Sequence, residues 1–383
     1  MFSQVDRLIM KVNHIMEYRI LGKSGLKVSA LSIGAMRLPA DTEKAVRLLR
    51  RAVDLGCTYI DTSRGYPESE IKVGKALKNG YRERVVLSTK CSPWVWKKRG
   101  YTTSADHTRS KIEESMKRLD VGYLDFYQVW SVYNEENFKQ ATAAGGMVAG
   151  IRQAIKEGLV GHVGVTVHTP VGLTKIILET GIFEAITVSF NVMNLTYEPA
   201  MATAAKLHIG VVVMNPFCGG LLARQSNTLA APIPGSSSPM KTAALRFVLD
   251  HPHVTTAISG FSRISDIEED VAIAQTAPLT AKERLLLGHR FSQLRKKSDE
   301  LCTQCGYCMV CPRNIEIKTI MHLKAQAEIF GFTAWARKEY AAIPSEKNAG
   351  RCNRCGKCEK KCTNHVAIRK QLAKAHAFLG KEE

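Results

Sequence analysis

Short apolar runs rich in β-branched residues alternate with amphipathic helical stretches between residues 29 and 275. Regular alternation of this kind is typical of repeated βα units and a parallel sheet. Right-handed crossovers close such a set into an α/β fold, the (β/α)8 TIM barrel, whose functional residues lie at the carboxyl ends of the strands. Eight runs are expected to form the strands: Ser29–Met36, Tyr59–Ser63, Val85–Lys90, Tyr123–Trp130, Gly161–Val167, Ala185–Phe190, Gly210–Asn215 and Thr255–Gly260.

The remaining sequence divides the chain into further segments. Residues 1–15 precede the pattern that begins at Met16, and we expect them to be a disordered N-terminal extension. A hairpin of residues 17–29 is expected to cover the bottom of a barrel that spans residues 16–279. A charged linker helix over 280–300 then leads to a small, mostly α-helical domain over 301–383, because 383 residues are many for one core.

Two cysteine runs lie in the small domain, and each supplies four thiolates. Zinc also accepts four cysteines, but zinc sites usually pair two CxxC knuckles. Gly306 and Gly356 give the backbone room to curl around a small inorganic core. The runs therefore indicate iron, in two cubane clusters with eight cysteine ligands. They read Cys302-x2-Cys305-x2-Cys308-x2-Cys311-Pro312 and Cys352-x2-Cys355-x2-Cys358-x3-Cys362.

These runs resemble those of bacterial ferredoxins that carry two [4Fe-4S] clusters. In such ferredoxins the fourth cysteine of each run ligates the other cluster. The resemblance implies one cluster on Cys302, Cys305, Cys308 and Cys362, and a second on Cys311, Cys352, Cys355 and Cys358. Two details differ from the usual pattern: the first run has only two residues before its last cysteine, and Thr363 stands where a second proline is common.

The chain is strongly basic, with a formal net charge of +19. Each cluster with four thiolates contributes about −2 and lowers this value. Residues 351–383 nevertheless hold nine Lys or Arg against three acids. This region is either a solvated basic face or a docking surface for an acidic electron carrier, such as a ferredoxin or flavodoxin, or for a flavoprotein.

Other partners and compartments are not indicated by the sequence. No aromatic residues interleave with a basic motif, so we expect no nucleic-acid binding. No segment reaches the ~18 consecutive apolar residues that a membrane span requires. Oxygen-sensitive clusters without a disulfide framework predict a reducing, cytoplasmic location.

Polar residues stand at the ends of the second, third and fourth expected strands: Asp61 and Tyr66, then Lys90, then Trp130. With these motifs the barrel resembles an aldo/keto reductase, and the whole of residues 16–383 resembles the members fused to a ferredoxin-like domain. In that family the tyrosine is the general acid toward a carbonyl oxygen, the lysine lowers its pKa, and the aspartate pairs with the lysine. A tyrosine with a pKa of about 10 needs about 4 kcal/mol of phenolate stabilisation to act near pH ~7, which a buried ammonium can supply.

The fourth position departs from the family, because most members have a histidine where this chain has Trp130. An indole offers one N–H donor, a wide apolar face and no titration. It can polarise a substrate oxygen or fill the pocket. The resemblance implies a small-molecule carbonyl or alcohol substrate, whose identity this departure leaves open.

The resemblance also implies NADP(H) across the barrel mouth. Thr166 can bond the nicotinamide carboxamide, whereas Thr187 stands for the family's glutamine and Val167 cannot bond it. A helix start with Ser262 and Arg263 suits an adenosine 2′-phosphate, although nearby aspartates oppose it. The residues expected to contact the cofactor are Gly34, Met36, Thr166, Asn191, Asn215, Pro216, Phe217, Gly219, Leu221, Gly260, Ser262, Arg263, Glu269 and Asp270.

Together these features predict an iron–sulfur oxidoreductase that reduces a carbonyl or oxidises an alcohol with NADP(H) and relays electrons through two [4Fe-4S] clusters. The alternative is a barrel without hydride transfer, in a protein that serves as an electron-transfer or assembly subunit for a partner redox enzyme. Trp130, Val167 and Thr187 keep that alternative open.

Overall fold

The computed structural model describes residues 15–96, 100–223, 239–295, 302 and 306–380. The chain clusters into two compact units. Nearly all of the expected N-terminal extension lies outside the described residues. Residues 191–194, 217–223 and 239–244, which we expected in the barrel, group with the described residues from 280 to 380, and the first unit holds the rest of the described residues.

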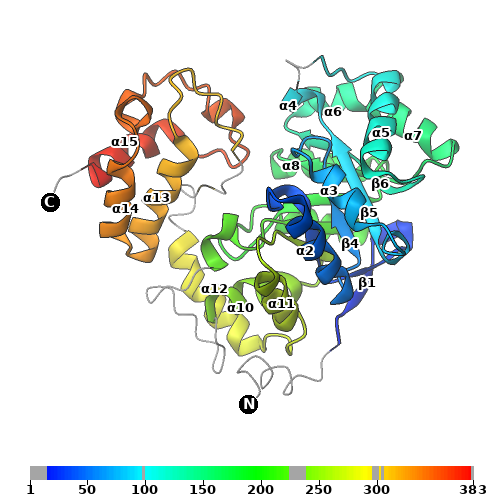
Figure 1. Ribbon diagram of the computed structural model, residues 1–383, viewed down its shortest axis with the longest axis horizontal. Helices are drawn as coiled ribbons and strands as arrows, with labels where there is room; N and C mark the ends of the chain where they lie inside the picture. Colours follow the sequence, from blue (N-terminus) through cyan, green and yellow to red (C-terminus); the bar gives the residue numbers. More distant parts are fainter. Residues whose placement is uncertain (1–14, 97–99, 224–238, 296–301, 303–305, 381–383) are drawn as a thin grey trace. The chain divides into compact units, whose positions relative to one another are not determined.

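Eight parallel strands of the first unit close into a barrel in the order β10-β3-β4-β5-β6-β7-β8-β9, which confirms the expected fold class (Figure 1). Their ends differ from the expected runs by a few residues. The strands are almost entirely buried, as expected where both faces of a parallel sheet are covered. They are β3 (Leu31–Gly34), β4 (Tyr59–Asp61), β5 (Val86–Cys91), β6 (Leu124–Val132), β7 (Val160–Val167), β8 (Ala185–Ser189), β9 (Gly210–Met214) and β10 (Thr256–Ser259).

Helices form the outer layer of the barrel, and α2, α3, α5 and α7 pack one against the next. Polar side chains cap three of them: Asp41 accepts from the Lys44 amide at 2.8 Å, Ser104 from the His107 amide at 3.3 Å, and Asn134 from the Asn137 amide at 2.9 Å. The helices are α2 (Thr42–Asp54), α3 (Ser69–Ala76), α4 (Pro93–Trp96), α5 (Ala105–Leu119), α6 (Glu135–Thr142), α7 (Met147–Lys156), α8 (Val171–Glu179), α9 (Glu198–Lys206), α10 (Pro239–Leu249) and α11 (Ile264–Ala274).

An antiparallel hairpin of β1 (Tyr18–Ile20) and β2 (Lys27–Ser29) closes the amino-terminal end of the barrel, as expected. Leu21 and Val28 are fully buried among side chains from the beginnings of the strands, including Tyr59 and Ala185. Gly22 has a φ of 56°, and a Cβ there would lie 2.2 Å from the Gly210 nitrogen. The carboxyl ends of the strands therefore remain for the functional site.

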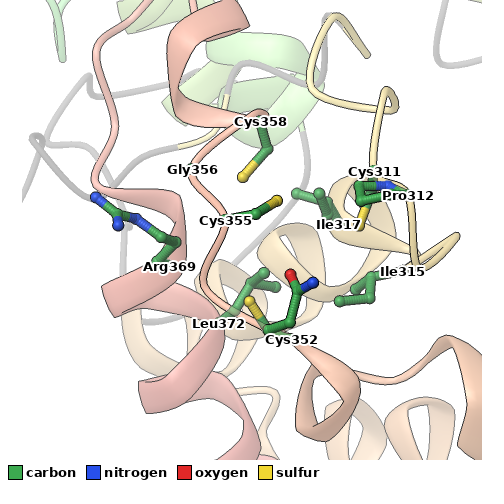
Figure 2. A pocket seen from close by; sticks show the side chains of 11 residues that line it. Cys311, Pro312, Ile315, Ile317, Cys352, Cys355, Gly356, Cys358, Arg369 and Leu372 are labelled. Carbon is green, nitrogen blue, oxygen red and sulfur yellow. The ribbon is translucent and has the colours of Figure 1, made fainter.

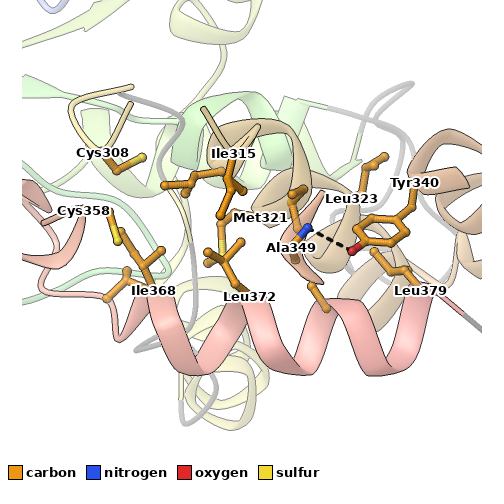
Figure 3. Close-up of a cluster of buried hydrophobic side chains, with 14 of the residues drawn as sticks. Cys308, Ile315, Met321, Leu323, Tyr340, Ala349, Cys358, Ile368, Leu372 and Leu379 are labelled. Carbon is orange, nitrogen blue, oxygen red and sulfur yellow. Dashed lines mark hydrogen bonds between the residues drawn. The ribbon is translucent and has the colours of Figure 1, made fainter. Parts of the chain in front are cut away.

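The second unit contains α12 (Ala281–Arg295), α13 (Ile317–Phe330), α14 (Thr333–Ala341) and α15 (Ile368–Leu379). Its apolar core, drawn in Figure 3, joins side chains from α13, α14 and α15 with the buried cysteines Cys308 and Cys358. Tyr340 adds a polar contact to this core, because its hydroxyl accepts from the Ala349 amide at 3.3 Å. In the part of the chain that the structure describes, every helix is too short or too polar to cross a membrane.

Candidate active site and cluster-binding sites

The ends of β4 and β5 bring together a buried ion pair. The Lys90 ammonium contacts a carboxylate oxygen of Asp61 and also donates to the carbonyl oxygen of Thr62 at 2.9 Å. Both charged side chains are at most 4% exposed. The same ammonium lies 5.1 Å from the centroid of the Tyr66 ring. Three of the four expected catalytic residues are therefore neighbours.

Burial is the largest cause of the pKa shifts of Asp61, Lys90 and Tyr66. It raises the pKa of Asp61 and lowers the pKa of Lys90, and each partner opposes the change in the other. Burial, with the Asp61 carboxylate second, raises the pKa of Tyr66 well above its ordinary value. The family resemblance implied a lowered tyrosine pKa, whereas in this structure burial and the Asp61 carboxylate raise the pKa of Tyr66. The phenol therefore carries its proton at neutral pH.

Trp130 packs edge-on against Tyr66, with ring centroids 5.6 Å apart and an interplanar angle of 79°. It stands at an irregularity in β6, whose register against β7 shifts between Val129 and Val132. The next residue, Ser131, has a φ of 61°, and its amide donates to the Thr166 hydroxyl at 2.7 Å. The fourth expected catalytic residue thus forms one wall beside the phenol.

A residue that the sequence analysis did not select, Gln128 on β6, links this group to the far side of the barrel. Its amide nitrogen donates to Asp61 at 3.1 Å and to the Ser88 hydroxyl at 2.7 Å. Its oxygen accepts from the Thr187 hydroxyl on β8 at 2.9 Å. Between them on β7, a Cβ at Gly164 would lie 2.9 Å from the Gln128 side chain, so the glycine leaves room for it. A glutamine flanked by Tyr127 and Val129 in a buried strand was the signal in the sequence.

Several expected cofactor residues already have partners. The Thr166 hydroxyl accepts from Ser131, as described above, and the Asn191 side chain accepts from the Met193 amide at 2.9 Å. Asp270 is buried and accepts from the Ser259 hydroxyl at 2.9 Å, so its role in the described fold is to hold α11 against β10.

The start of α11 is also occupied. One oxygen of Asp266 accepts from the amides of Ser262 and Arg263, at 3.2 and 3.0 Å. The other oxygen accepts from the Arg263 guanidinium at 2.9 Å. The carboxylate therefore takes the donors that a 2′-phosphate would use.

The other expected cofactor residues lie at strand ends or in the glycine loop. Gly34 ends β3, and Asn215 follows β9 with a φ of 65°. In the second unit, Gly219 has a φ of 71°, which suits the glycine. Met36, Pro216, Phe217, Leu221, Gly260 and Glu269 complete the set at loop or helix positions.

Four cysteines of the second unit line one pocket (Figure 2). Three come from the second run and the fourth, Cys311, from the first, so the structure brings together the set that the ferredoxin resemblance implies. Ile315, Ile317 and Leu372 form its apolar wall. Gly356 has a φ of 74°, which lets the backbone curl around the space. The four thiols are those of Cys311, Cys352, Cys355 and Cys358.

The second implied set is described only in part. Cys308 is buried in the core of the unit, and Cys302 and Cys362 pack against that core. The Cys362 sulfur accepts from the Val366 amide at 3.4 Å, a contact that stabilises a thiolate. Cys305 lies outside the described residues.

The donor chemistry fits iron–sulfur clusters. Four thiols around a shared pocket are the ligand set that a [4Fe-4S] cluster takes. Cys57, Cys91 and Cys218 are buried free thiols, and burial raises the pKa of Cys91 to about 11.

Comparison with known proteins separates the same two parts. Residues 30–284 match the model of the aldo/keto reductase family, and residues 301–367 match that of a 4Fe-4S dicluster domain. The chain is 25% identical over 305 residues to an uncharacterized oxidoreductase of Bacillus subtilis, YqkF, covering 70% of this chain and 94% of that protein. It is 27% identical over 285 residues to L-galactose dehydrogenase of Arabidopsis thaliana, covering 67% and 87%.

Solved structures agree with the barrel. The holo form of an aldo-keto reductase from Bacillus halodurans has a TM-score of 0.61 and 25% identity, and the match covers 72% of this chain and 96% of that one. An aldo/keto reductase from Klebsiella pneumoniae, solved with NADP and acetate, has a TM-score of 0.59 at 21% identity over 71% and 95%, which shows the fold. The chain belongs to the aldo/keto reductase family of oxidoreductases and carries a 4Fe-4S dicluster domain after its barrel.

Proposed function

We propose that the barrel uses NADP(H) to reduce a small-molecule carbonyl compound, or to oxidise the corresponding alcohol, and that the dicluster domain relays electrons. One observation carries the enzymatic part: the buried Asp61–Lys90 pair lies beside the Tyr66 ring at the carboxyl end of the barrel. The active sites of (β/α)8 barrels lie at this end.

Each of these side chains has a distinct role in the proposal. Tyr66 gives its proton to the carbonyl oxygen as negative charge develops there, because its raised pKa keeps the phenol protonated. Lys90 stabilises the phenolate that remains, and Asp61 holds the ammonium in place. Trp130 packs against the phenol and excludes water from one side. When bound, NADP(H) supplies the hydride for reduction and accepts it in oxidation.

The choice of NADP(H) rests on this chain's own residues. The Arg263 side chain is 78% exposed at the start of α11, where an adenosine 2′-phosphate is favoured by the helix N-terminus. Its present partner, Asp266, must give way for the phosphate to bind. We therefore expect modest rather than tight discrimination between NADPH and NADH.

The clusters are proposed to connect this chemistry to a one-electron partner. When bound, two [4Fe-4S] clusters supply two one-electron steps, the number of electrons in one hydride. The partner we propose is an acidic carrier such as a ferredoxin or flavodoxin, or a flavoprotein, in a reducing cytoplasm. The excess of basic residues over 351–383 supports this choice.

The test uses anaerobic, cluster-loaded protein mixed with NADPH and an electrophilic aldehyde, para-nitrobenzaldehyde. We expect aldehyde-dependent loss of NADPH absorbance, slowed about 100-fold or more in Tyr66→Phe with unchanged NADPH binding. Tyr81→Phe is the matched control, because that hydroxyl bonds Asp54 outside the site. Equal rates in wild type and Tyr66→Phe would refute the assignment of the proton donor.

A second function is favoured by two observations at the barrel mouth. Trp130 replaces the family's histidine, and Asp266 occupies the donors at the start of α11. Both suit a barrel without hydride transfer, in a protein that acts as an electron-transfer or assembly subunit. Wild-type protein that keeps its clusters but binds no NADPH or NADH would favour this function.

A further inference from the structure

One cysteine of the shared pocket is an exposed residue. Cys355 is exposed, whereas Cys311 and Cys352 are partly buried and Cys358 is buried. Electron exchange between proteins weakens steeply with distance, so a cluster is best reached from the side on which its ligands are exposed. The Cys355 side is therefore the accessible edge of this pocket.

A network of hydrogen bonds fixes the loop that carries Cys355. Glu359 accepts from the backbone amide of Arg369 at 2.8 Å and from its guanidinium at 2.7 Å. The guanidinium also donates to the carbonyl oxygen of Arg354 at 3.2 Å. A Cβ at Gly356 would lie 3.7 Å from the guanidinium carbon, so the loop and Arg369 are in close contact (Figure 2). The loop is thus tied at both ends to the first turn of α15.

Positive charge surrounds this fixed loop. Residues 351–370 contain seven Lys or Arg, all of them exposed, and one acid, Glu359. Glu359 pairs with Arg369, so the segment keeps an excess of six positive charges. The seven are Arg351, Arg354, Lys357, Lys360, Lys361, Arg369 and Lys370. Such a concentration of one sign attracts a partner of opposite charge and speeds its association.

We infer that the surface formed by Arg354, Cys355, Lys357 and Arg369, called here the Cys355 face, docks a small acidic one-electron carrier protein. The inference rests on the electron relay in the proposed function. A cluster held by Cys311, Cys352, Cys355 and Cys358 would accept one electron from the reduced carrier, which would be oxidised. No bond or proton is exchanged, and the reverse transfer balances in the same way.

The experiment follows the reduction of oxidised, cluster-loaded full-length protein by flavodoxin hydroquinone in an anaerobic stopped-flow instrument. Neither NADP(H) nor a carbonyl compound is present, so an inactive barrel leaves the result unchanged. The test variant is Arg354→Gln with Lys357→Gln, which keeps Arg369. The control is Lys44→Gln with Lys338→Gln, which removes two exposed cations from α2 and α14.

At low ionic strength we expect the test variant to react about tenfold more slowly than wild type, and the control to stay within about twofold. The wild-type rate falls as salt is added, because screening weakens the attraction. Reduced methyl viologen, a small cation, reduces wild type and both variants at similar rates. Equal slowing of the test and control variants, or a rate independent of salt, overturns the inference. A lower rate of reduction of the test variant by methyl viologen also overturns the inference, because the substitutions then change the cluster and not the docking of the carrier.

Discussion

Replacing Gln128 with leucine tests whether the link across the barrel positions the buried ion pair. Gln128 is 1% exposed and makes three hydrogen bonds, to Asp61, Ser88 and Thr187. Leucine has a similar volume but no polar atoms, so the substitution removes all three bonds and leaves little empty space.

The loss of stability follows from the kind of bond removed. A buried hydrogen bond to a charged group is worth about 1.5–3 kcal/mol, and one between neutral groups about 0.5–1.5 kcal/mol. The leucine recovers part of the loss by burying apolar surface. We expect the free energy of unfolding of the barrel to fall by about 3 kcal/mol, which lowers its midpoint temperature by roughly 6–10 °C.

The functional effect acts through the carboxylate. The Gln128 bond lowers the pKa of Asp61, so its removal raises that pKa further and weakens the hold on Lys90. We expect kcat for aldehyde reduction to fall about tenfold at neutral pH, and less at higher pH, where Asp61 is again ionised. The assays are thermal unfolding and the pH dependence of kcat with NADPH.

Thr256→Val is the control for this variant, because it removes a buried hydroxyl that donates to Ser32 at 2.7 Å, away from the ion pair. It should cost about 1 kcal/mol and leave kcat unchanged. If Gln128→Leu lowers stability but gives the wild-type pH profile of kcat, Gln128 is a packing residue only and the reasoning is refuted.

Three further predictions follow from other parts of the structure. The raised pKa of Tyr66 places loss of the donated proton above pH ~10, so reductive kcat/KM stays flat from pH ~6 to ~9; a fall near pH ~7 that disappears in Tyr66→Phe would contradict this. Asp266→Ala frees the amides of Ser262 and Arg263 and removes a negative charge, so we expect the ratio of NADPH to NADH affinity to rise about tenfold in a fluorescence titration. The control Glu268→Ala, which loses an exposed ion pair with Arg51, should change this ratio little. An unchanged ratio in Asp266→Ala would show that the start of α11 does not contact the phosphate. Anaerobic removal of iron should unfold the second unit, because its core includes Cys308 and Cys358. Limited proteolysis read by mass spectrometry should then cleave residues after 301 while the barrel stays intact. Equal protease resistance with and without iron would show that the unit folds without its clusters.

The barrel and the cysteine runs could be predicted because their signals are local. Each βα unit carries its own hydrophobic period, and the runs place thiols by short spacings whatever the rest of the chain does. The three strand-end residues Asp61, Tyr66 and Lys90 were also found from the sequence, since the ends of neighbouring parallel strands meet at one edge of the barrel.

What the sequence missed depends on tertiary placement. The bond from Gln128 to Thr187 joins two strands that are separated by β7, and it requires the space left by Gly164. The direction of the Tyr66 pKa shift depends on burial, which a motif does not record. The aspartates near Ser262 were noted as opposing charges, but the capture of two backbone amides by Asp266 depends on how the chain enters α11.

The grouping of residues near 191–194 and after β9 with the second unit was not predictable either. Residues 217–223 and 239–244 lie between β9 and β10 in the sequence, so their position along the chain does not separate them from the first unit. The division of the chain by sequence order alone therefore differs from the division by contacts.

Iron content of paired cysteine variants tests most directly whether the two runs share their clusters. Anaerobically purified wild type should hold about eight iron atoms per chain. If Cys311 and Cys352 ligate the same cluster, as their common pocket indicates, Cys311→Ala with Cys352→Ala retains about four, while Cys311→Ala with Cys302→Ala retains almost none. The opposite pattern would contradict sharing between the runs, and folded, iron-free wild type would contradict the clusters themselves.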